Sequence, residues 1–176
     1  MELAKSKVGE VKLLVIRHDV AEPRDPAAGR AGDALRPLTT AGQKRARQAA
    51  RALAKQVVRV DVLASSGLRR ADETALALSA ALGGLEVQRT PALAPGAKPV
   101  ALARWLRGLE GAATVAVVGH EPGLSTLVTW LVSGLSNPWL ELGKGGACLL
   151  ELDGAIEPGT ARLVWLLRPG QLRGLR

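Results

Sequence analysis

The chain has 176 residues, of which 47% are hydrophobic and 23% charged, a composition typical of one globular domain. No apolar stretch approaches the ~20 residues of a membrane-spanning helix, which excludes a protein anchored by such helices. The net charge of +8 is compatible with nucleic acid, anionic lipid or a phosphorylated ligand, but no Phe or Tyr is present on which bases could stack. We therefore expect neither a nucleic-acid nor a membrane partner.

The N-terminal segment and the single cysteine indicate a cellular location. Met1–Lys12 is charged and lacks the apolar core of a secretory signal. Cys148 has no disulfide partner within the chain and lies in an apolar run, so a buried thiol is expected there. We expect a cytoplasmic protein with a single domain over residues 1–176 and flexible ends at residues 1–10 and 169–176.

The first half of the chain alternates strand and helix patterns. Val11–Ile16 is a short apolar run that predicts a buried strand, whereas residues 21–38 are rich in Pro, Gly, Asp and Ala and predict a long loop. Thr39 or Thr40 then caps a helix that runs to about Lys55. The next expected elements are a strand at 60–64, a helix at 68–82 and a short strand at 85–88.

The second half continues the alternation and ends in a predicted antiparallel hairpin. The expected elements are a loop at 90–98, a helix at 99–109, the clearest buried strand at 113–118, a helix at 124–133, and strands at 147–152 and 161–167. Four tryptophans lie among aliphatic residues, as core or groove tryptophans do: Trp105, Trp130, Trp139 and Trp165. Strands that alternate with helices predict an α/β fold, a three-layer α/β/α sandwich with a mostly parallel central sheet.

The only two histidines of the chain each follow a strongly apolar strand. His18, preceded by Arg17, ends the first strand, and His120 ends the strand at 113–118. Ligands of α/β sheets bind beyond the carboxyl ends of the strands, so two parallel strands could bring both imidazoles to one edge.

A third polar segment, Ser66–Thr74, runs from a strand end into a helix N-terminus, where an arginine can reach the same edge. Because guanidinium groups pair bidentately with phosphate oxygens, two arginines and two histidines predict a site for a dianion such as phosphate. One histidine is then available as a nucleophile, kept neutral by the nearby positive charges. Two histidines without a matching carboxylate cluster make a poor metal site, so neither a metal nor another cofactor is expected.

Four segments, in matching order and spacing, resemble the motifs of the histidine phosphatase superfamily, also called phosphoglycerate mutase-like. Leu14–His18 resembles the Arg-His-Gly signature, Pro37–Gln43 the Leu-Thr-x-x-Gly helix start, Ser66–Thr74 the Ser-Pro-x-x-Arg-Ala-x-Gln-Thr motif, and Val118–Leu124 the second-histidine motif. The similarity extends from about residue 11 to 167. The short length and the Gly-His-Glu-Pro-Gly-Leu form are most similar to the SixA-type phosphohistidine phosphatases.

The resemblance implies a role for each motif residue. His18 would be the nucleophile that becomes phosphohistidine, and Arg17, Arg70 and His120 would surround the phosphoryl group. Arg70 rather than Arg69 matches the motif arginine, because it directly precedes the motif alanine. For Arg69 we expect a solvated charge on the helix.

Three departures from the family pattern affect the interpretation. Asp19 replaces the glycine after the nucleophile and could orient His18 or face solvent, and Gly67 replaces a proline in a turn. Glu121, which is not one of these departures, could also orient the site or face solvent. The chain is too compact for the inserted segment with which larger relatives protonate an alkoxide leaving group. An easier leaving group is therefore favoured, and protein phosphohistidine is preferred over a sugar phosphate.

Several alternatives stay open from the sequence. The chain could be a phosphatase of small-molecule phosphomonoesters, or a catalytically silent phosphate-binding module that uses the same cleft. The positive charge alone suggests a nucleic-acid-binding protein, which the scarcity of aromatics and the lack of a recognition motif disfavour. The oligomeric state is left open.

Overall fold

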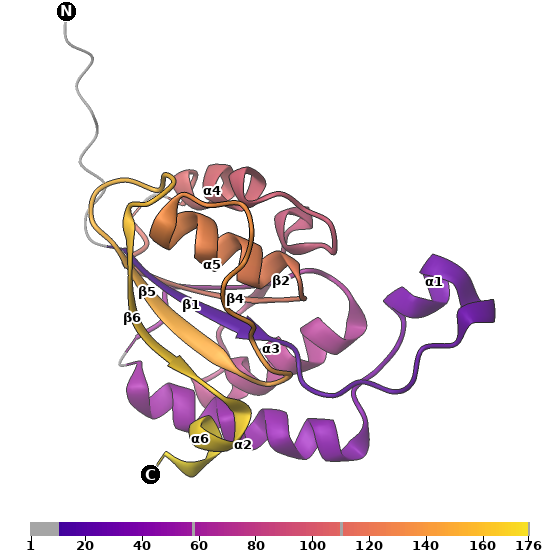
Figure 1. Cartoon of the computed structure of the whole chain (residues 1–176). Helices are drawn as coiled ribbons and strands as arrows, with labels where there is room; N and C mark the ends of the chain where they lie inside the picture. The colour runs from indigo at the N-terminus through magenta and orange to yellow at the C-terminus, as the bar shows by residue number, and fades with distance from the viewer. Residues whose placement is uncertain (1–10, 58, 110, 176) are drawn as a thin grey trace, which may run out of the picture.

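The computed structural model describes residues 11–57, 59–109 and 111–175. These residues form a six-stranded sheet with helices on both faces (Figure 1). The strands are β1 (Val11–Arg17), β2 (Val62–Ser65), β3 (Val87–Arg89), β4 (Thr114–Gly119), β5 (Ala147–Leu152) and β6 (Ala161–Leu167). The helices are α1 (Gly29–Ala34), α2 (Thr40–Gln56), α3 (Arg69–Ala81), α4 (Pro99–Arg107), α5 (Gly123–Ser133) and α6 (Pro169–Gly174), with short 3-10 helices η1 (Pro26–Ala28) and η2 (Pro91–Leu93).

The strand order is β3-β2-β4-β1-β5-β6. The first four strands of this order pair in parallel, whereas β5 runs antiparallel to both of its neighbours, β1 and β6. The prediction of a three-layer sandwich with a mostly parallel sheet is therefore confirmed, as is the terminal hairpin. The carboxyl ends of β1, β2 and β4 lie at one edge of the sheet, and the chain leaves this edge into α1, α3 and α5.

Strand β1 is apolar from Leu13 to Ile16 because both faces of the sheet are covered by helices there. Leu13 and Val15 pack in the core on the side of α4 and α5, whereas Leu14 and Ile16 pack against α2, α3 and α6 on the other side. The alternation of side chains along a strand explains this division. Each fully buried Leu or Val side chain stabilises the fold by roughly 1.5–3 kcal/mol.

Helix α2 begins against the segment that follows β1. The Thr39 hydroxyl accepts a hydrogen bond from the Gly42 N–H at 2.9 Å and so caps the helix as the sequence predicted. A Cβ atom on Gly42 would lie 2.2 Å from the Val20 carbonyl oxygen. Glycine at this position lets α2 lie close to the chain that leaves β1.

The structure corrects the prediction of a long loop over residues 21–38. Ala21 and Leu38 form an antiparallel bridge, and between them the chain folds into η1 and α1, which project from the body of the molecule (Figure 1). The Asp25 carboxylate caps η1 by accepting from Ala27 N–H at 2.8 Å. One or two turns of helix carry too short a pattern to be recognised in a sequence rich in Gly and Pro.

The prediction of a flexible end at residues 169–176 is wrong for Pro169–Gly174, which forms α6. Leu172 is fully buried with the core residues of α2, and the Arg168 N–H donates to the Gln171 side-chain oxygen at 2.9 Å. Two leucines in a short basic tail, Leu172 and Leu175, gave no periodic signal. Residues 1–10, whose flexibility was also predicted, lie outside the described residues.

Two smaller differences concern β3 and a tryptophan. The strand expected at 85–88 lies at Val87–Arg89. Trp139, expected in a core or groove, is 54% exposed, because it lies in the turn after α5. Cys148 is buried as expected.

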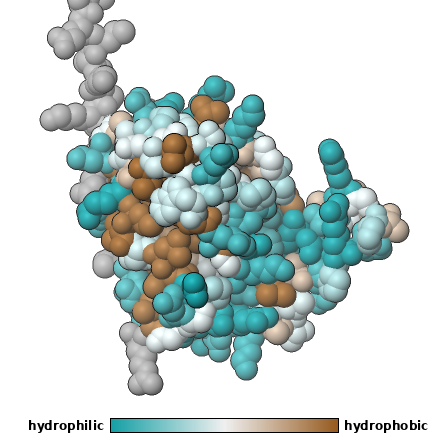
Figure 2. All heavy atoms as spheres, viewed as in Figure 1, coloured by the Kyte–Doolittle hydropathy of each residue, from teal (hydrophilic) through white to brown (hydrophobic). Residues whose placement is uncertain are grey.

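The surface differs between the two sides of the molecule. Hydrophobic residues gather on the side of the edge strand β6, whereas the surface around α1 is mostly hydrophilic (Figure 2). No helix within the described residues combines the length and the hydropathy that crossing a membrane requires.

Candidate active site

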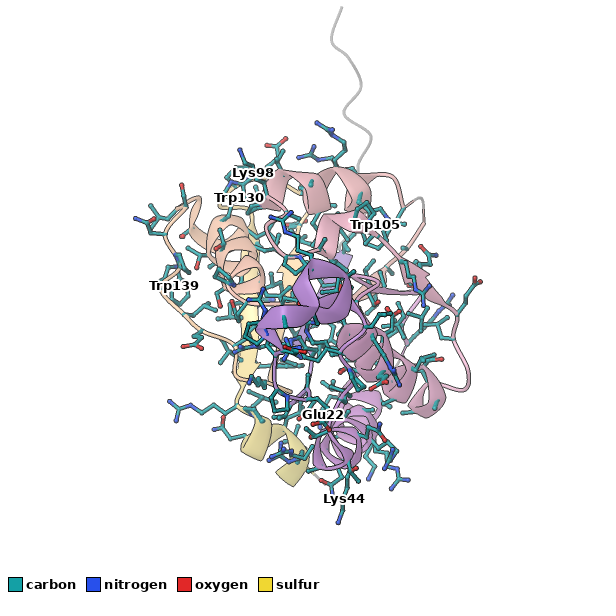
Figure 3. The ribbon with its side chains drawn as sticks, turned by 90° about the vertical axis from the view of Figure 1, so that its right-hand side faces the viewer. Glu22, Lys44, Lys98, Trp105, Trp130 and Trp139 are labelled. Carbon is teal, nitrogen blue, oxygen red and sulfur yellow. The ribbon has the colours of Figure 1, made fainter. Side chains whose placement is uncertain are left out.

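The register of the two central strands brings the histidines together. Arg17 of β1 pairs with Gly119 of β4, and the His18 N–H donates to the Gly119 carbonyl at 3.2 Å, so His18 and His120 leave the sheet side by side. Their ring centroids are 4.9 Å apart, with the planes tilted by 55°. Figure 3 looks onto this edge of the molecule, with the short helix α1 in front of the strand ends.

A cavity of about 400 Å³ opens at this edge. It brings together the four residues that the sequence placed at one site: Arg17, His18, Arg70 and His120. The other residues that line it are Ala21, Arg24, Asp33, Arg36, Pro95, Glu121 and Lys144. Cationic side chains outnumber carboxylates around the cavity, which therefore favours an anionic ligand.

His18 is held in one tautomer. Its Nδ1 lies 2.6 Å from the backbone carbonyl oxygen of Asp19. A carbonyl only accepts hydrogen bonds, so Nδ1 carries the hydrogen and Nε2 keeps its lone pair. Burial lowers the pKa of His18 to about 4, and the nearby charges of Arg70 and Arg17 act in the same direction. The imidazole is therefore neutral at physiological pH, as a nucleophile must be.

His120 is held through its other nitrogen. Its Nε2 lies 2.6 Å from the Ser66 hydroxyl, while its Nδ1 is buried and has no hydrogen-bond partner. Burial and the neighbouring His18 lower the pKa of His120 to about 3, so this ring is neutral too. If the Ser66 hydroxyl donates to Nε2, the Nδ1–H is free to donate to a ligand.

The two arginines are fixed by their outer nitrogens. Arg17 Nη1 donates to the Leu142 carbonyl at 2.6 Å. Arg70 Nη1 donates to the Asp33 carbonyl at 2.8 Å, and its Nη2 donates to the Asp33 carboxylate at 3.2 Å. The Nε atoms of both arginines are buried without a hydrogen-bond partner. Each guanidinium is thus held in place while one of its donors stays available.

Unpartnered buried polar atoms cost free energy, so their position is informative. Among the described residues such side-chain atoms occur in five residues, and three of these line the cavity. The three are donors: Arg17 Nε, Arg70 Nε and, in the tautomer above, His120 Nδ1. A tetrahedral oxyanion placed beside His18 would lie next to the three residues that carry these donors.

Sequence reasoning missed the acidic and basic residues that α1 and its flanks contribute. Asp33 contacts Arg70, lies 3.1 Å from Arg36 and 4.0 Å from Arg24. Burial opposes ionisation of Asp33, but the guanidiniums of Arg70 and Arg36 outweigh it and lower the carboxyl pKa. The signal that could have found Arg36 is its place directly before the Pro-Leu-Thr motif, and Lys144 had no such signal.

The structure answers the open questions about Glu121 and Arg69. The Glu121 carboxylate lines the cavity but accepts hydrogen bonds from the Ser125 hydroxyl at 2.5 Å, the Ser125 N–H at 3.2 Å and the Leu142 N–H at 3.0 Å. It joins the start of α5 to the loop that holds Arg17. Arg69 is exposed and pairs with Glu73 one helical turn later, as expected of a surface charge.

Asp19 is among the predicted site residues, yet it does not line the cavity. Its side chain is 1% exposed and faces the opposite direction, towards Ala46 and Ala50 of α2. Its backbone carbonyl is the group that contacts His18.

Comparison with known proteins places the chain in a family. The model of the histidine phosphatase superfamily (branch 1) matches residues 13–94. An uncharacterized protein of Picosynechococcus sp. is 34% identical over 160 residues, which cover 89% of this chain and 95% of that protein. The chain belongs to the histidine phosphatase superfamily, as its four motifs predicted.

The same comparison identifies the type within the superfamily. The phosphohistidine phosphatase SixA of Escherichia coli K12 is 27% identical over 166 residues, which cover 93% of this chain and 97% of SixA. A solved structure of the protein histidine phosphatase SixA complexed with tungstate aligns with a TM-score of 0.79 and 26% identity, over 92% of this chain and 99% of that one. The chain is thus of the SixA type, and its sandwich is the phosphoglycerate mutase-like fold.

Proposed function

We propose that this protein is a phosphatase that takes a phosphoryl group onto His18 and passes it to water, without a metal ion or other cofactor. The observation that carries the proposal is the convergence of three unpartnered buried donors, on Arg17, Arg70 and His120, beside the neutral imidazole of His18. A phosphoryl group in the cavity would accept from these donors while its phosphorus faces Nε2.

The reaction has two steps in this proposal. In the first, the lone pair of His18 Nε2 forms a bond to phosphorus, and the bond to the leaving group breaks with its electron pair on that group. The arginines neutralise the phosphoryl oxygens, which is the main requirement of phosphoryl transfer. The phosphorylated ring retains its Nδ1–H and carries a positive charge, which the Asp19 carbonyl stabilises.

In the second step a water oxygen attacks phosphorus on the side opposite Nε2. The P–N bond breaks, its electron pair returns to Nε2, and the water proton leaves with the phosphate or to solvent. The neutral His18 is restored, with its hydrogen still on Nδ1.

The preferred substrate in the proposal is phosphohistidine on a protein. An alkoxide leaving group needs a proton from an acid, whereas a histidine leaving group departs as neutral imidazole when its second nitrogen carries a proton. Two carboxylates line the cavity in the described part of the chain. Neither is suited to donate, because Glu121 is occupied as a hydrogen-bond acceptor and the pKa of Asp33 is lowered by its arginines.

A substrate panel tests the proposal at neutral pH in the presence of a chelator. It compares a phosphohistidine-bearing protein with phosphoserine and a sugar phosphate by kcat/KM. We expect the phosphohistidine protein to be hydrolysed fastest, with no loss on chelation. Faster hydrolysis of the two esters would favour the runner-up, a phosphatase of small phosphomonoesters. Tight phosphate binding without hydrolysis of any substrate would favour a silent binding module.

A further inference from the structure

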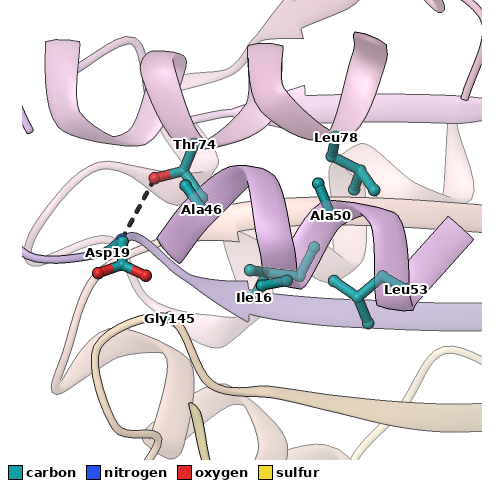
Figure 4. A pocket seen from close by; sticks show the side chains of 9 residues that line it. Ile16, Asp19, Ala46, Ala50, Leu53, Thr74, Leu78 and Gly145 are labelled. Carbon is teal, nitrogen blue, oxygen red and sulfur yellow. Dashed lines mark hydrogen bonds between the residues drawn. The ribbon is translucent and has the colours of Figure 1, made fainter. Parts of the chain in front are cut away.

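Asp19 stands where the Arg-His-Gly signature has a glycine, and its carboxylate is buried beneath the catalytic cavity. The side chain lies in a small apolar pocket between the end of β1, helices α2 and α3, and Gly145 (Figure 4). Burial raises the pKa of this carboxyl against the opposing effects of the Val20 N–H and Arg45. An ionisable group placed among alanine and leucine side chains costs free energy, so its contacts are informative.

Both carboxylate oxygens of Asp19 are confined. Oδ1 accepts a hydrogen bond from the Val20 N–H at 2.7 Å and lies 3.6 Å from Arg45 Nε. Oδ2 lies against Gly145, whose φ is +76°, and a Cβ atom on that glycine would be 2.3 Å from Oδ2. Gly145 thus permits a close approach that any other residue would prevent.

The peptide groups around residue 19 are held at the same time. The Asp19 N–H donates to the Thr74 hydroxyl at 3.2 Å (Figure 4). That hydroxyl donates in turn to the Arg70 carbonyl at 2.8 Å. The Gly145 N–H donates to the His18 carbonyl at 3.1 Å. The Asp19 carbonyl is left with one orientation, which faces His18 Nδ1 at 2.6 Å.

We propose that Asp19 is a positioning residue whose buried carboxylate fixes its own carbonyl on His18 Nδ1 and thereby keeps the Nε2 lone pair directed into the cavity. The inference rests on the proposed function of His18 as nucleophile. A family glycine at this position would leave the peptide freer to rotate. In this chain the carboxylate supplies the rigidity. Its Oδ1 is held by the Val20 N–H and lies near Arg45, and its Oδ2, which has no hydrogen-bond partner, is confined sterically against Gly145.

The test compares Asp19→Gly with Asp19→Asn. The glycine variant removes the anchor, so we expect kcat to fall about tenfold, the scale of one lost hydrogen bond, with phosphate affinity unchanged. The asparagine variant keeps an oxygen that accepts from the Val20 N–H and is expected to retain most of kcat. Nitrogen-15 NMR of His18 gives a readout independent of turnover: only the Nδ1–H tautomer in wild type and Asp19→Asn, and a tautomer mixture in Asp19→Gly.

Matched variants on α2 provide the control. Arg45 contacts Asp19, whereas Arg47, two residues later, is exposed and lines a different pocket. Arg45→Gln should lower kcat about twofold, the effect of a weak ion pair, while Arg47→Gln should have no effect. Because Asp19 is buried, each variant is checked for thermal unfolding before assay.

The possible outcomes separate this inference from the proposed function. If wild type never becomes phosphorylated on His18, the proposed function fails, and the NMR comparison still tests the tautomer. If wild type is phosphorylated but Asp19→Gly keeps both its kcat and a single Nδ1–H tautomer, the positioning role of Asp19 is overturned. Equal loss in the glycine and asparagine variants would contradict it too.

Discussion

The ends of β1 and β4 carry the two histidines of the chain, and they hold them in different ways. At the end of β1 the imidazole of His18 is tied to a backbone carbonyl, which accepts only, so its hydrogen is fixed on Nδ1. At the end of β4 the imidazole of His120 is tied to the Ser66 hydroxyl, which both donates and accepts. One tautomer is imposed by the backbone and the other depends on a side chain.

This difference matches the two roles that we propose for the histidines. A nucleophile needs a permanent lone pair on the nitrogen that faces the substrate, and a fixed acceptor on the opposite nitrogen provides it. A group that binds a phosphoryl oxygen needs a donor, and a hydroxyl on the opposite nitrogen allows one. The two strand ends are therefore expected to respond differently to substitution.

The largest effect is expected at His18. His18→Asn removes the nucleophilic nitrogen and should lower kcat by about 10⁴-fold or more, because the other neutral imidazole of the cavity, His120, is hydrogen-bonded through its Nε2 to Ser66. Isothermal titration with inorganic phosphate serves as the control and should show that the variant still binds the anion. Turnover of His18→Asn near the wild-type rate would contradict the different roles that we propose for His18 and His120.

The next largest effect is expected at Arg70, which lines the cavity together with both histidines. Arg70→Lys keeps the positive charge but removes the planar fork and the Nε donor, so we expect kcat/KM to fall about 100-fold. Steady-state kinetics measures this loss. Arg69, one position earlier, is exposed, so Arg69→Lys serves as the control and should behave like wild type. A lysine at position 70 that restores full activity would mean that charge alone suffices.

The pH dependence of stability follows from the pKa of His18, which burial lowers to about 4. When the pH falls below 6.5, the unfolded chain takes up the proton first, so stability is lost between pH 6.5 and about 4. Asn at position 18 cannot titrate, and the variant should lose roughly 3 kcal/mol less over this window. Urea unfolding at pH 7 and pH 4.5 measures the difference. Equal losses in both proteins would show that His18 is not buried as a neutral ring.

A smaller effect is expected at the β4 end. Ser66→Ala removes the hydroxyl that is hydrogen-bonded to His120 Nε2, so kcat/KM should fall about tenfold, as expected for one hydrogen bond. Nitrogen-15 NMR should then show mixed tautomers for His120 and an unchanged Nδ1–H tautomer for His18. A change confined to His18 would reverse the assignment of the two strand ends.

The smallest effect is expected at Asp33, whose carboxylate competes with a bound anion for Arg70. Asp33→Asn keeps the backbone carbonyl that accepts from Arg70 and removes one negative charge from the cavity. The inhibition constant for inorganic phosphate should fall about fivefold, the scale of one screened charge near the surface. Weaker phosphate binding would instead show that the carboxylate positions Arg70.

The sequence predicted, for identifiable reasons, most of the fold and the meeting of Arg17, His18, Arg70 and His120 at one edge of the sheet. The two central strands contain unbroken apolar runs, Leu13–Ile16 in β1 and Val115–Val118 in β4, and a histidine lies shortly after each run. The pairing of Arg17 with Gly119 could not be predicted, because register depends on contacts that no local pattern records. The same limit hid the hydrogen bond of Ser66 to His120, whose positions are 54 residues apart.

Other features escaped prediction because they are small or because one residue decides them. Helix α1 has 6 residues, and its Asp33 acquires a role only through contact with Arg70. The sequence left two options for Asp19, orienting His18 or facing solvent. The structure excludes a solvent-facing Asp19, because its side chain is 1% exposed. The backbone carbonyl of Asp19 is the group that contacts His18.

The most direct test of the central claim is to trap the phosphoenzyme. Wild type is mixed with a phosphohistidine-bearing protein, quenched in alkali within milliseconds, and digested for mass spectrometry of the peptides that contain the two histidines. We predict an acid-labile phosphoryl group on His18 and none on His120, with none at either position in His18→Asn. Phosphate on His120, or rapid turnover with no phosphohistidine on the enzyme, would contradict the account.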